Sequence, residues 1–157
     1  MALHTGLRRS EILGLHIRDV NTKASTISVN QTVLIVGGKP IISATTKNDA
    51  KTLSILRRQI MWTLKNRMAA SDYEDNGLLF CRRDGRPYDP KYISHTANKY
   101  GKSAGFHLTF HMLRHTHATL LLKAGVHFKI VQVRLGHSSF QQTMDTYSHV
   151  LPDIKEN

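Results

Sequence analysis

The sequence predicts an α+β fold that is mainly α-helical and carries a small three-stranded antiparallel sheet. An early segment is rich in β-branched residues, and a longer second half has apolar residues at helical spacing. The 157 residues, 40% of them hydrophobic and 21% charged, suffice for a compact domain with a core. Neither a repeat nor a linker divides the chain, so we expect one domain over residues 1–157.

The first half of the chain is expected to hold one helix and the sheet. Thr5 and Gly6 precede apolar residues at loosely helical spacing, which predicts a helix over residues 5–17. Three β-rich runs follow, and glycine or polar residues separate them. They predict an antiparallel meander with strands over residues 25–36, 41–46 and 52–56.

The remainder of the chain is expected to be helical. The predicted helices cover residues 57–70, 90–103, 109–123, 128–135 and 139–147. Thr109 and Ser139 are typical N-cap residues, because a hydroxyl oxygen accepts from a free backbone N–H. Gly136 is typical of a helix end, because glycine adopts the left-handed conformation without steric cost.

The charge of the chain indicates a polyanionic partner. Lys and Arg number 22 against 11 Asp and Glu, which gives a formal net charge of +11. Nucleic acid would bind such a surface with release of counterions, whereas the alternative is a basic protein with well-solvated lysines. Cys81 is the only cysteine, which excludes an intramolecular disulfide and fits a reducing cytoplasm. We expect no membrane partner, because no apolar run reaches membrane-spanning length.

His111 and Arg114 form the first candidate site. They are three residues apart on a predicted helix and therefore share a face. A guanidinium beside an imidazole suits a phosphate, which needs a bidentate donor and a proton shuttle, although a solvated basic face is the alternative. His111 and His115 have metal-ligand spacing, but Met112 stands where a zinc-binding helix carries Glu, so no metal is expected.

Two further groups are candidates for chemistry. His137 follows the turn expected at Gly136, and Tyr147 comes ten residues later near the end of a short helix, where it could move toward a substrate. The alternative for Tyr147 is a half-buried aromatic side chain with a partner for its hydroxyl. Arg8 and Glu11 lie one helical turn apart and form either a surface ion pair or a carboxylate that orients a functional guanidinium.

Four segments together resemble the tyrosine recombinase family, also called the phage integrase family. They are TGLRRSEILGL, ATTKNDAKT, HMLRHTHATLLLKAG and RLGHSSFQQTMDTYSHV, and they follow the order and spacing of that family over nearly the whole chain. The resemblance implies the fold of the catalytic domain and an enzyme that cuts and rejoins DNA site-specifically. The catalytic residues that it implies are Arg8, Lys47, His111, Arg114, His137 and Tyr147.

The resemblance also implies which residue bonds covalently to the DNA and which residues transfer protons. Tyr147 would attack the scissile phosphorus, form a 3′-phosphotyrosine and free a 5′-hydroxyl. Ionising a phenol at neutral pH costs about 4 kcal/mol, so a base is needed, and His111 is expected to serve. Lys47 would protonate the departing oxygen as general acid, with Lys51 as the alternative for this role.

The remaining residues would stabilise charge. Arg8 and Arg114 would bind the added negative charge of the phosphorane, so neither a metal, ATP nor another cofactor is expected. His137 would donate a hydrogen bond to a non-bridging oxygen. Glu11 would hold Arg8 in place from behind.

The resemblance covers the catalytic part of the family alone. Full-length members carry an N-terminal core-binding domain and some an arm-binding domain, so we interpret the chain as a fragment that lacks both. The implied partner is double-stranded DNA at recombination sites, bound by a tetramer of the full-length protein in the cytoplasm, while the fragment is monomeric. The alternatives are a helix-turn-helix-like DNA-binding module over residues 125–147 and type IB topoisomerase-like nicking and closing.

Overall fold

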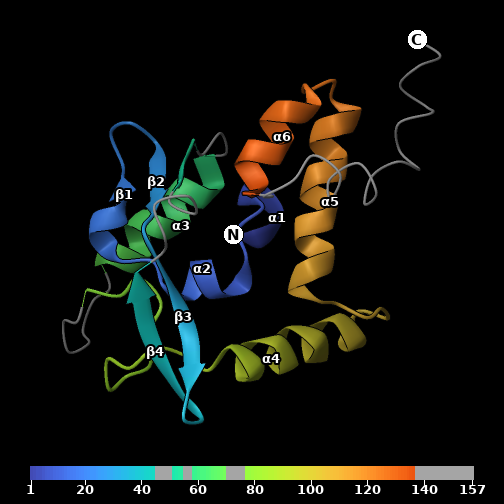
Figure 1. The fold of residues 1–157 in the computed structure, drawn as a ribbon. Helices are drawn as coiled ribbons and strands as arrows, with labels where there is room; N and C mark the ends of the chain where they lie inside the picture. The colour runs from blue at the N-terminus through green and yellow to red at the C-terminus, as the bar shows by residue number, and fades with distance from the viewer. Residues whose placement is uncertain (45–50, 55–57, 70–76, 137–157) are drawn as a thin grey trace.

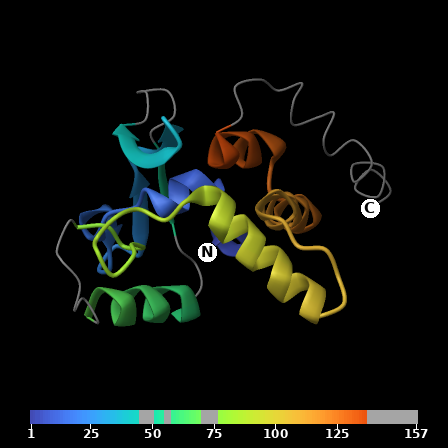
Figure 2. The same cartoon turned by 90° about the horizontal axis from the view of Figure 1, so that it is seen from below.

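The computed structural model describes residues 1–44, 51–54, 58–69 and 77–136 (Figure 1). The strands and helix α3 (Arg58–Ala69) lie on one side of the molecule, and helices α5 (Phe110–Lys123) and α6 (Phe128–Leu135) lie on the other. Helices α1 (Ala2–Thr5) and α2 (Arg9–Leu13) lie between the two sides, as the views in Figures 1 and 2 agree. The first residues of the chain therefore occupy the junction on which the site is built.

The predicted single helix over residues 5–17 is wrong. Gly6 has a left-handed backbone (φ 70°) and ends α1, and Arg8 is extended before α2 begins. A short 3-10 turn, η1 (Ile17–Asp19), follows. Thr5 and Gly6 thus mark the end of one helix instead of the start of another. The interruption sets Arg8 at the N-cap of α2, where its backbone N–H is free of the helix ladder.

The predicted antiparallel three-stranded sheet is confirmed, but the meander is wrong. Strands β1 (Val20–Asn21), β2 (Thr26–Val29) and β5 (Lys51–Ser54) pair in the order β1-β2-β5. The predicted run over 25–36 divides at Asn30, whose side-chain amide donates to Asp19 Oδ1 at 3.3 Å. Asn30 belongs to neither strand, so the run forms β2 before it and a second strand after it.

The second part of the divided run forms a hairpin of its own. Strand β3 (Gln31–Val36) pairs in antiparallel register with β4 (Lys39–Ala44) and with no other described strand. Gly37 and Gly38 form its two-residue turn, and both have positive φ (56° and 76°), as the turns that match strand twist require. The tip of the hairpin lies near the start of α4 (Pro90–Ser103) (Figure 1).

The described helices that follow β5 agree with the prediction. They are α3 (Arg58–Ala69), α4 (Pro90–Ser103), α5 (Phe110–Lys123) and α6 (Phe128–Leu135). Thr109 caps α5 as predicted, since its hydroxyl oxygen accepts from Met112 N at 3.1 Å. The left-handed Gly136 (φ 65°) ends α6. The predicted helix over 139–147, with its cap Ser139, lies outside the described residues.

Two apolar clusters hold these elements in place. One lies between the strands, α2 and α3, and its most buried members are Leu7, Leu15, Ile27, Val29 and Leu64. The other joins α5 to α6 through Ala118, Leu122, Val131 and Leu135. Burying each Leu or Ile contributes roughly 1.5–3 kcal/mol, so the clusters fix both sides of the junction. None of the helices within the described ranges is long and apolar enough to cross a membrane.

Candidate active site

Arg8 is held by hydrogen bonds from its backbone and its side chain to Glu11 and Gly136. Its backbone N–H donates to Glu11 Oε2 at 2.6 Å, and its Nη1 donates to Glu11 Oε1 at 3.1 Å. Its Nη2 donates to the carbonyl of Gly136 at 3.0 Å, so the guanidinium joins α2 to the end of α6. The side chain stays 46% exposed, which leaves part of the guanidinium open to a ligand.

Glu11 lies behind Arg8 and is buried with a second cation. The Glu11 side chain is 5% exposed, and its carboxylate accepts from Lys51 Nζ at 2.9 Å. Burial lowers the pKa of Lys51, and the charges of Arg114 and Arg8 lower it further, while Glu11 opposes them. Lys51 also donates to the carbonyl of Leu135 at 3.4 Å, so β5 is tied to both α2 and α6.

Arg114 is the most buried cation of the site. It is 6% exposed, and its Nη1 and Nη2 donate to the carbonyls of Gly6 and Leu135, each at 2.6 Å. The Leu135 carbonyl lies at the C-terminus of α6, where the helix dipole favours positive charge. One guanidinium thus joins the end of α1, the middle of α5 and the end of α6.

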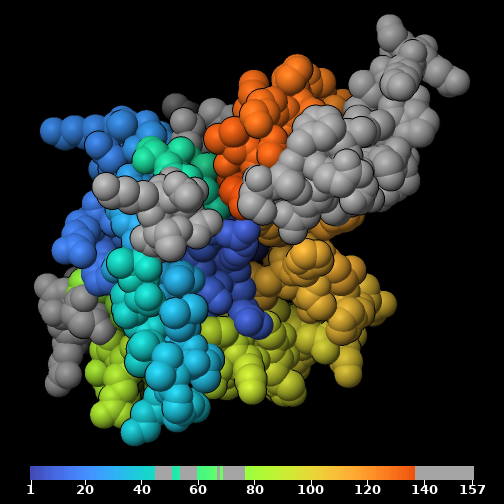
Figure 3. Space-filling model, viewed as in Figure 1, coloured from blue at the N-terminus to red at the C-terminus, as the bar shows by residue number. Residues whose placement is uncertain are grey.

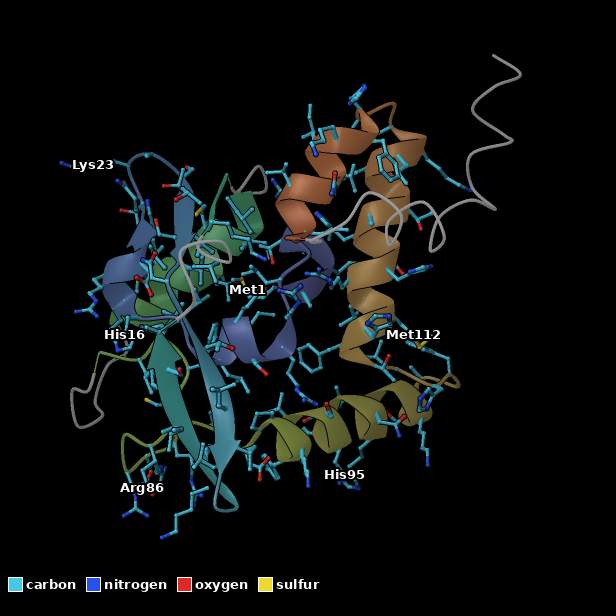
Figure 4. All side chains as sticks on the ribbon, in the orientation of Figure 1. Met1, His16, Lys23, Arg86, His95 and Met112 are labelled. Atoms are coloured by element: carbon cyan, nitrogen blue, oxygen red, sulfur yellow. The ribbon has the colours of Figure 1, made fainter. Side chains whose placement is uncertain are left out.

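The arginines face an open cavity of about 430 Å³. In Figure 3 the dark blue surface of the first residues is framed by the β3–β4 hairpin, α4 and α5. In Figure 4 side chains of α2, α4 and the start of α5 point into the space between these helices, whereas His95 points outward. Among the described residues, those that line the cavity include no acidic side chain; they are Arg8, Arg9, Ser10, Ser94, Thr109, Phe110, His111 and Arg114.

The structure brings three of the predicted catalytic residues to this cavity. Arg8, His111 and Arg114 line it, and Glu11 Oε1 accepts from Arg8 Nη1 at 3.1 Å. His111 lies on the first turn of α5 with its side chain exposed. Lys47, His137 and Tyr147 lie outside the described residues. Lys51, the alternative to Lys47, lies beside Arg8 and Arg114 without lining the cavity.

His117 was missed by sequence reasoning. Its ring is 6% exposed, with Nδ1 3.0 Å from the carbonyl of Leu3 and Nε2 accepting from Arg134 Nε at 3.1 Å. Nδ1 therefore carries the proton. Burial and the charge of Arg134 lower the pKa of His117 to about 4. The signal available was helical spacing, because His117 lies three residues after Arg114 on one face.

Arg9 and Ser94 were also missed, although both line the cavity. Arg9 Nη1 donates to Ser94 Oγ, which connects α2 to α4. The residue pattern around Arg9 carries no signal of this contact, since it depends on where α4 packs.

The two histidines with metal-ligand spacing stack with each other. The rings of His111 and His115 have centroids 6.5 Å apart and lie 27° from parallel. Within the described ranges, no group of three or more His, Cys, Asp or Glu side chains could hold a metal ion. His111 lines the arginine cavity.

Comparison with known proteins decides the family. The sequence profile of the Phage integrase family matches residues 1–153. The chain belongs to this family. It is 28% identical, over 93% of its length, to the integrase of Staphylococcus phage L54a and 35% identical, over 88%, to the tyrosine recombinase XerA of Pyrococcus horikoshii. It spans 45% and 44% of these two relatives, which is less than half of their length.

Solved structures of the family share the fold. The Tn1549 transposon integrase, in complex with circular intermediate DNA, superposes with a TM-score of 0.79 at 26% identity, over 93% of this chain and 52% of that one. XerA recombinase gives a TM-score of 0.76 at 25% identity, over 98% of this chain and 54% of that one. The α+β fold of this integrase-family chain is therefore that of a tyrosine recombinase catalytic domain.

Proposed function

We propose that the chain is the catalytic domain of a site-specific DNA recombinase that cleaves and rejoins strands through a 3′-phosphotyrosine on Tyr147. The observation that carries this proposal is the convergence of Arg8, Arg114 and His111 on one open cavity whose described lining residues include no acidic side chain. Such a cavity favours an anion the size of a phosphodiester segment. Family membership supports the same reaction.

The chemistry conserves the phosphodiester energy. The Tyr147 oxygen attacks phosphorus and the bond from phosphorus to the 5′-oxygen breaks, so the phosphoryl group moves to tyrosine and a 5′-hydroxyl leaves. A different 5′-hydroxyl reverses the step and rejoins the strands. His111 takes the phenolic proton, and His137 donates a hydrogen bond to a non-bridging oxygen.

Arg8 and Arg114 stabilise the phosphorane. The phosphorane carries more negative charge than the diester, and donors fixed beforehand bind the added charge without reorganising. Both guanidiniums are held by backbone carbonyls, of Gly136 for Arg8 and of Gly6 and Leu135 for Arg114. These carbonyls carry no full negative charge, whereas the Glu11 carboxylate also pairs with Arg8 Nη1 at 3.1 Å. The Arg8 side chain is 46% exposed, so part of its guanidinium stays open to the substrate.

Lys47 is proposed as the general acid, and Lys51 as the residue that holds the charge cluster together. The Lys51 ammonium is ion-paired to the buried Glu11 at 2.9 Å and is only 10% exposed, which favours a structural role. A general acid becomes dispensable when the leaving group is a thiolate, which departs without a proton. A 5′-bridging phosphorothiolate substrate should therefore restore cleavage by Lys47→Ala but not by Lys51→Ala.

The proposed partner is double-stranded DNA at recombination sites. The net charge of +11 supports binding to the phosphate backbone, and the related Tn1549 integrase was solved with DNA. We further propose that the complete protein acts as a tetramer on DNA in the cytoplasm of a bacterial host. A non-catalytic helix-turn-helix-like module or a topoisomerase would account for the charge but is less consistent with the family match.

The test is covalent trapping on a suicide DNA substrate nicked near the cleavage site. The substrate comes from the attachment sequence flanking the gene, and the complete gene product runs beside this chain in buffer with a metal chelator. We expect a denaturation-resistant adduct with wild type and none with Tyr147→Phe, which should retain DNA affinity. Binding by the complete protein without any adduct would overturn catalysis and favour the DNA-binding module.

A further inference from the structure

The cavity holds a third arginine for which the proposed cleavage chemistry has no role. Arg9 is half-buried beside Arg8, and its Nη1 donates to Ser94 Oγ on α4. Its Nε is shielded from solvent and has no hydrogen-bond partner in the part of the chain that the structure describes. Within those same residues no carboxylate pairs with Arg9. At the wall of the cavity, no carboxylate of the described residues therefore balances the charge of Arg9.

This arrangement differs from that of the other two arginines. Arg8 has the carboxylate of Glu11 behind it, and Arg114 has two backbone carbonyls. Ser94 gives Arg9 an acceptor without negative charge, so the hydroxyl orients the guanidinium but leaves its charge unmatched. A guanidinium has five N–H donors, and one bond to a hydroxyl leaves donors for an anion.

The size of the cavity allows more than one phosphate. A volume of about 430 Å³ is in the range of pockets for ligands much larger than a single phosphate group. Phosphates repeat along a DNA strand with one charge per roughly 3.4 Å of axis, so a strand seated at Arg8 and Arg114 presents a neighbouring phosphate nearby. Arg9 on α2 and Ser94 on α4 line the same cavity and contact each other there.

The geometry points to Arg9, oriented by Ser94, as a DNA-positioning residue that binds the phosphate next to the scissile one on the cleaved strand. This inference rests on the proposed function and extends it from the reacting phosphate to its neighbour. Contacts to backbone phosphates fix the register of DNA on a protein, so Arg9 would set the scissile phosphate against Arg8 and Arg114.

The test combines protein variants with single-phosphate neutralisation. Suicide substrates carry a methylphosphonate, which lacks the phosphate charge, at one of several positions flanking the scissile phosphate. The complete gene product is compared as wild type, Arg9→Ala, Arg9→Lys and Ser94→Ala, and the rate of adduct formation is measured. Lys99→Ala is the matched control, since Lys99 is an exposed cation of α4 that does not line the cavity.

We expect Arg9→Ala to lower the adduct rate about tenfold on unmodified DNA and Lys99→Ala to leave it nearly unchanged. Neutralising one neighbouring phosphate should slow wild type by a similar factor, and Arg9→Ala should then cause no further loss. At other flanking positions the tenfold effect should persist. If Arg9→Ala fails to fold, Arg9→Lys, which keeps the charge but loses the fork, should show the same position dependence at smaller amplitude.

An equal penalty for Arg9→Ala on every modified substrate, or no penalty at all, would overturn the inference. The first result would mean that Arg9 only holds α2 against α4. Failure of the proposed function is recognised separately, because wild-type protein would then form no adduct on any substrate.

Discussion

Replacing Glu11 with Gln tests whether the buried carboxylate holds the charge cluster together. Glu11 accepts from the Arg8 backbone N–H at 2.6 Å, from Arg8 Nη1 at 3.1 Å and from Lys51 Nζ at 2.9 Å. Gln keeps the shape of the side chain, but it removes the negative charge and turns an N–H₂ toward one of these donors. The variant therefore leaves Lys51 buried and uncompensated beside Arg8.

The loss of stability in Glu11→Gln can be worked out from the exposure of the side chains that Glu11 pairs with. Arg8 is 46% exposed, and such pairs contribute at most about 1 kcal/mol. Lys51 and Glu11 are 10% and 5% exposed, and removing one partner of a buried pair costs about 3–5 kcal/mol. We expect Glu11→Gln to lower the free energy of unfolding by about 3 kcal/mol. This corresponds to a Tm lower by about 6–12 °C for a domain of this size.

The assay is urea unfolding of the chain followed by circular dichroism, with a double-mutant cycle. Lys51→Met removes the unmatched cation, so the double variant Glu11→Gln with Lys51→Met should be more stable than Glu11→Gln alone by about 1.5 kcal/mol or more. A double variant no more stable than Glu11→Gln, or a loss below about 1 kcal/mol for Glu11→Gln, would refute the reasoning that this pair is a buried, mutually dependent unit.

Three other predictions concern stability. The lowered pKa of His117, about 4 against its ordinary value of 6.5, means that the unfolded chain binds more protons between these pH values. The contribution of neutral His117 to the free energy of unfolding is present in full above about pH 6.5 and is lost as pH falls toward 4. We expect this contribution to be about 1–2 kcal/mol after solvent screening. Urea unfolding at a series of pH values should show it in the wild type and not in His117→Gln. Gly101→Ala should lower stability by about 1–3 kcal/mol although Ala favours helix, because the added Cβ would lie 2.5 Å from Leu108 Cβ; an unchanged Tm would contradict this. Thr109→Ala should cost about 1 kcal/mol by thermal unfolding and Thr109→Ser much less, since Ser keeps the capping oxygen for Met112 N.

The helices of the second half could be predicted because their ends are encoded locally. Thr109 and Gly136 fix the bounds of α5 and α6 through a cap oxygen and a left-handed backbone, both readable from residue type. The helices of residues 1–17 could not be predicted in this way, because Thr5 and Gly6 are compatible with either the end or the start of a helix. Burial of Leu7 between α1 and α2 is a tertiary effect that local pattern does not contain.

In the sheet, too, the strands could be predicted from local sequence, whereas the pairing of the strands could not. The β-rich runs were recognised, but β2 pairs with β5 across an intervening hairpin, and nothing in either strand specifies that partner. At the site, Arg8, His111 and Arg114 were expected from motif spacing and line one cavity. Arg9 was not expected, because its contact to Ser94 depends on how α4 packs against α2, and the sequence around Arg9 does not contain that information.

The contacts that complete the cavity also determine when it can exist. Arg8 reaches a carbonyl 128 residues later in the chain, and Arg114 joins Gly6 to Leu135. Closing so long a loop is slow relative to forming the local helices, so the arginine arrangement is expected among the last features to form during folding. On the ribosome, a nascent chain that lacks α6 has both arginines but lacks the Gly136 and Leu135 carbonyls that help to orient them. An incomplete chain would thus hold the cationic residues but not the fixed geometry, which limits attack on DNA to the fully folded domain.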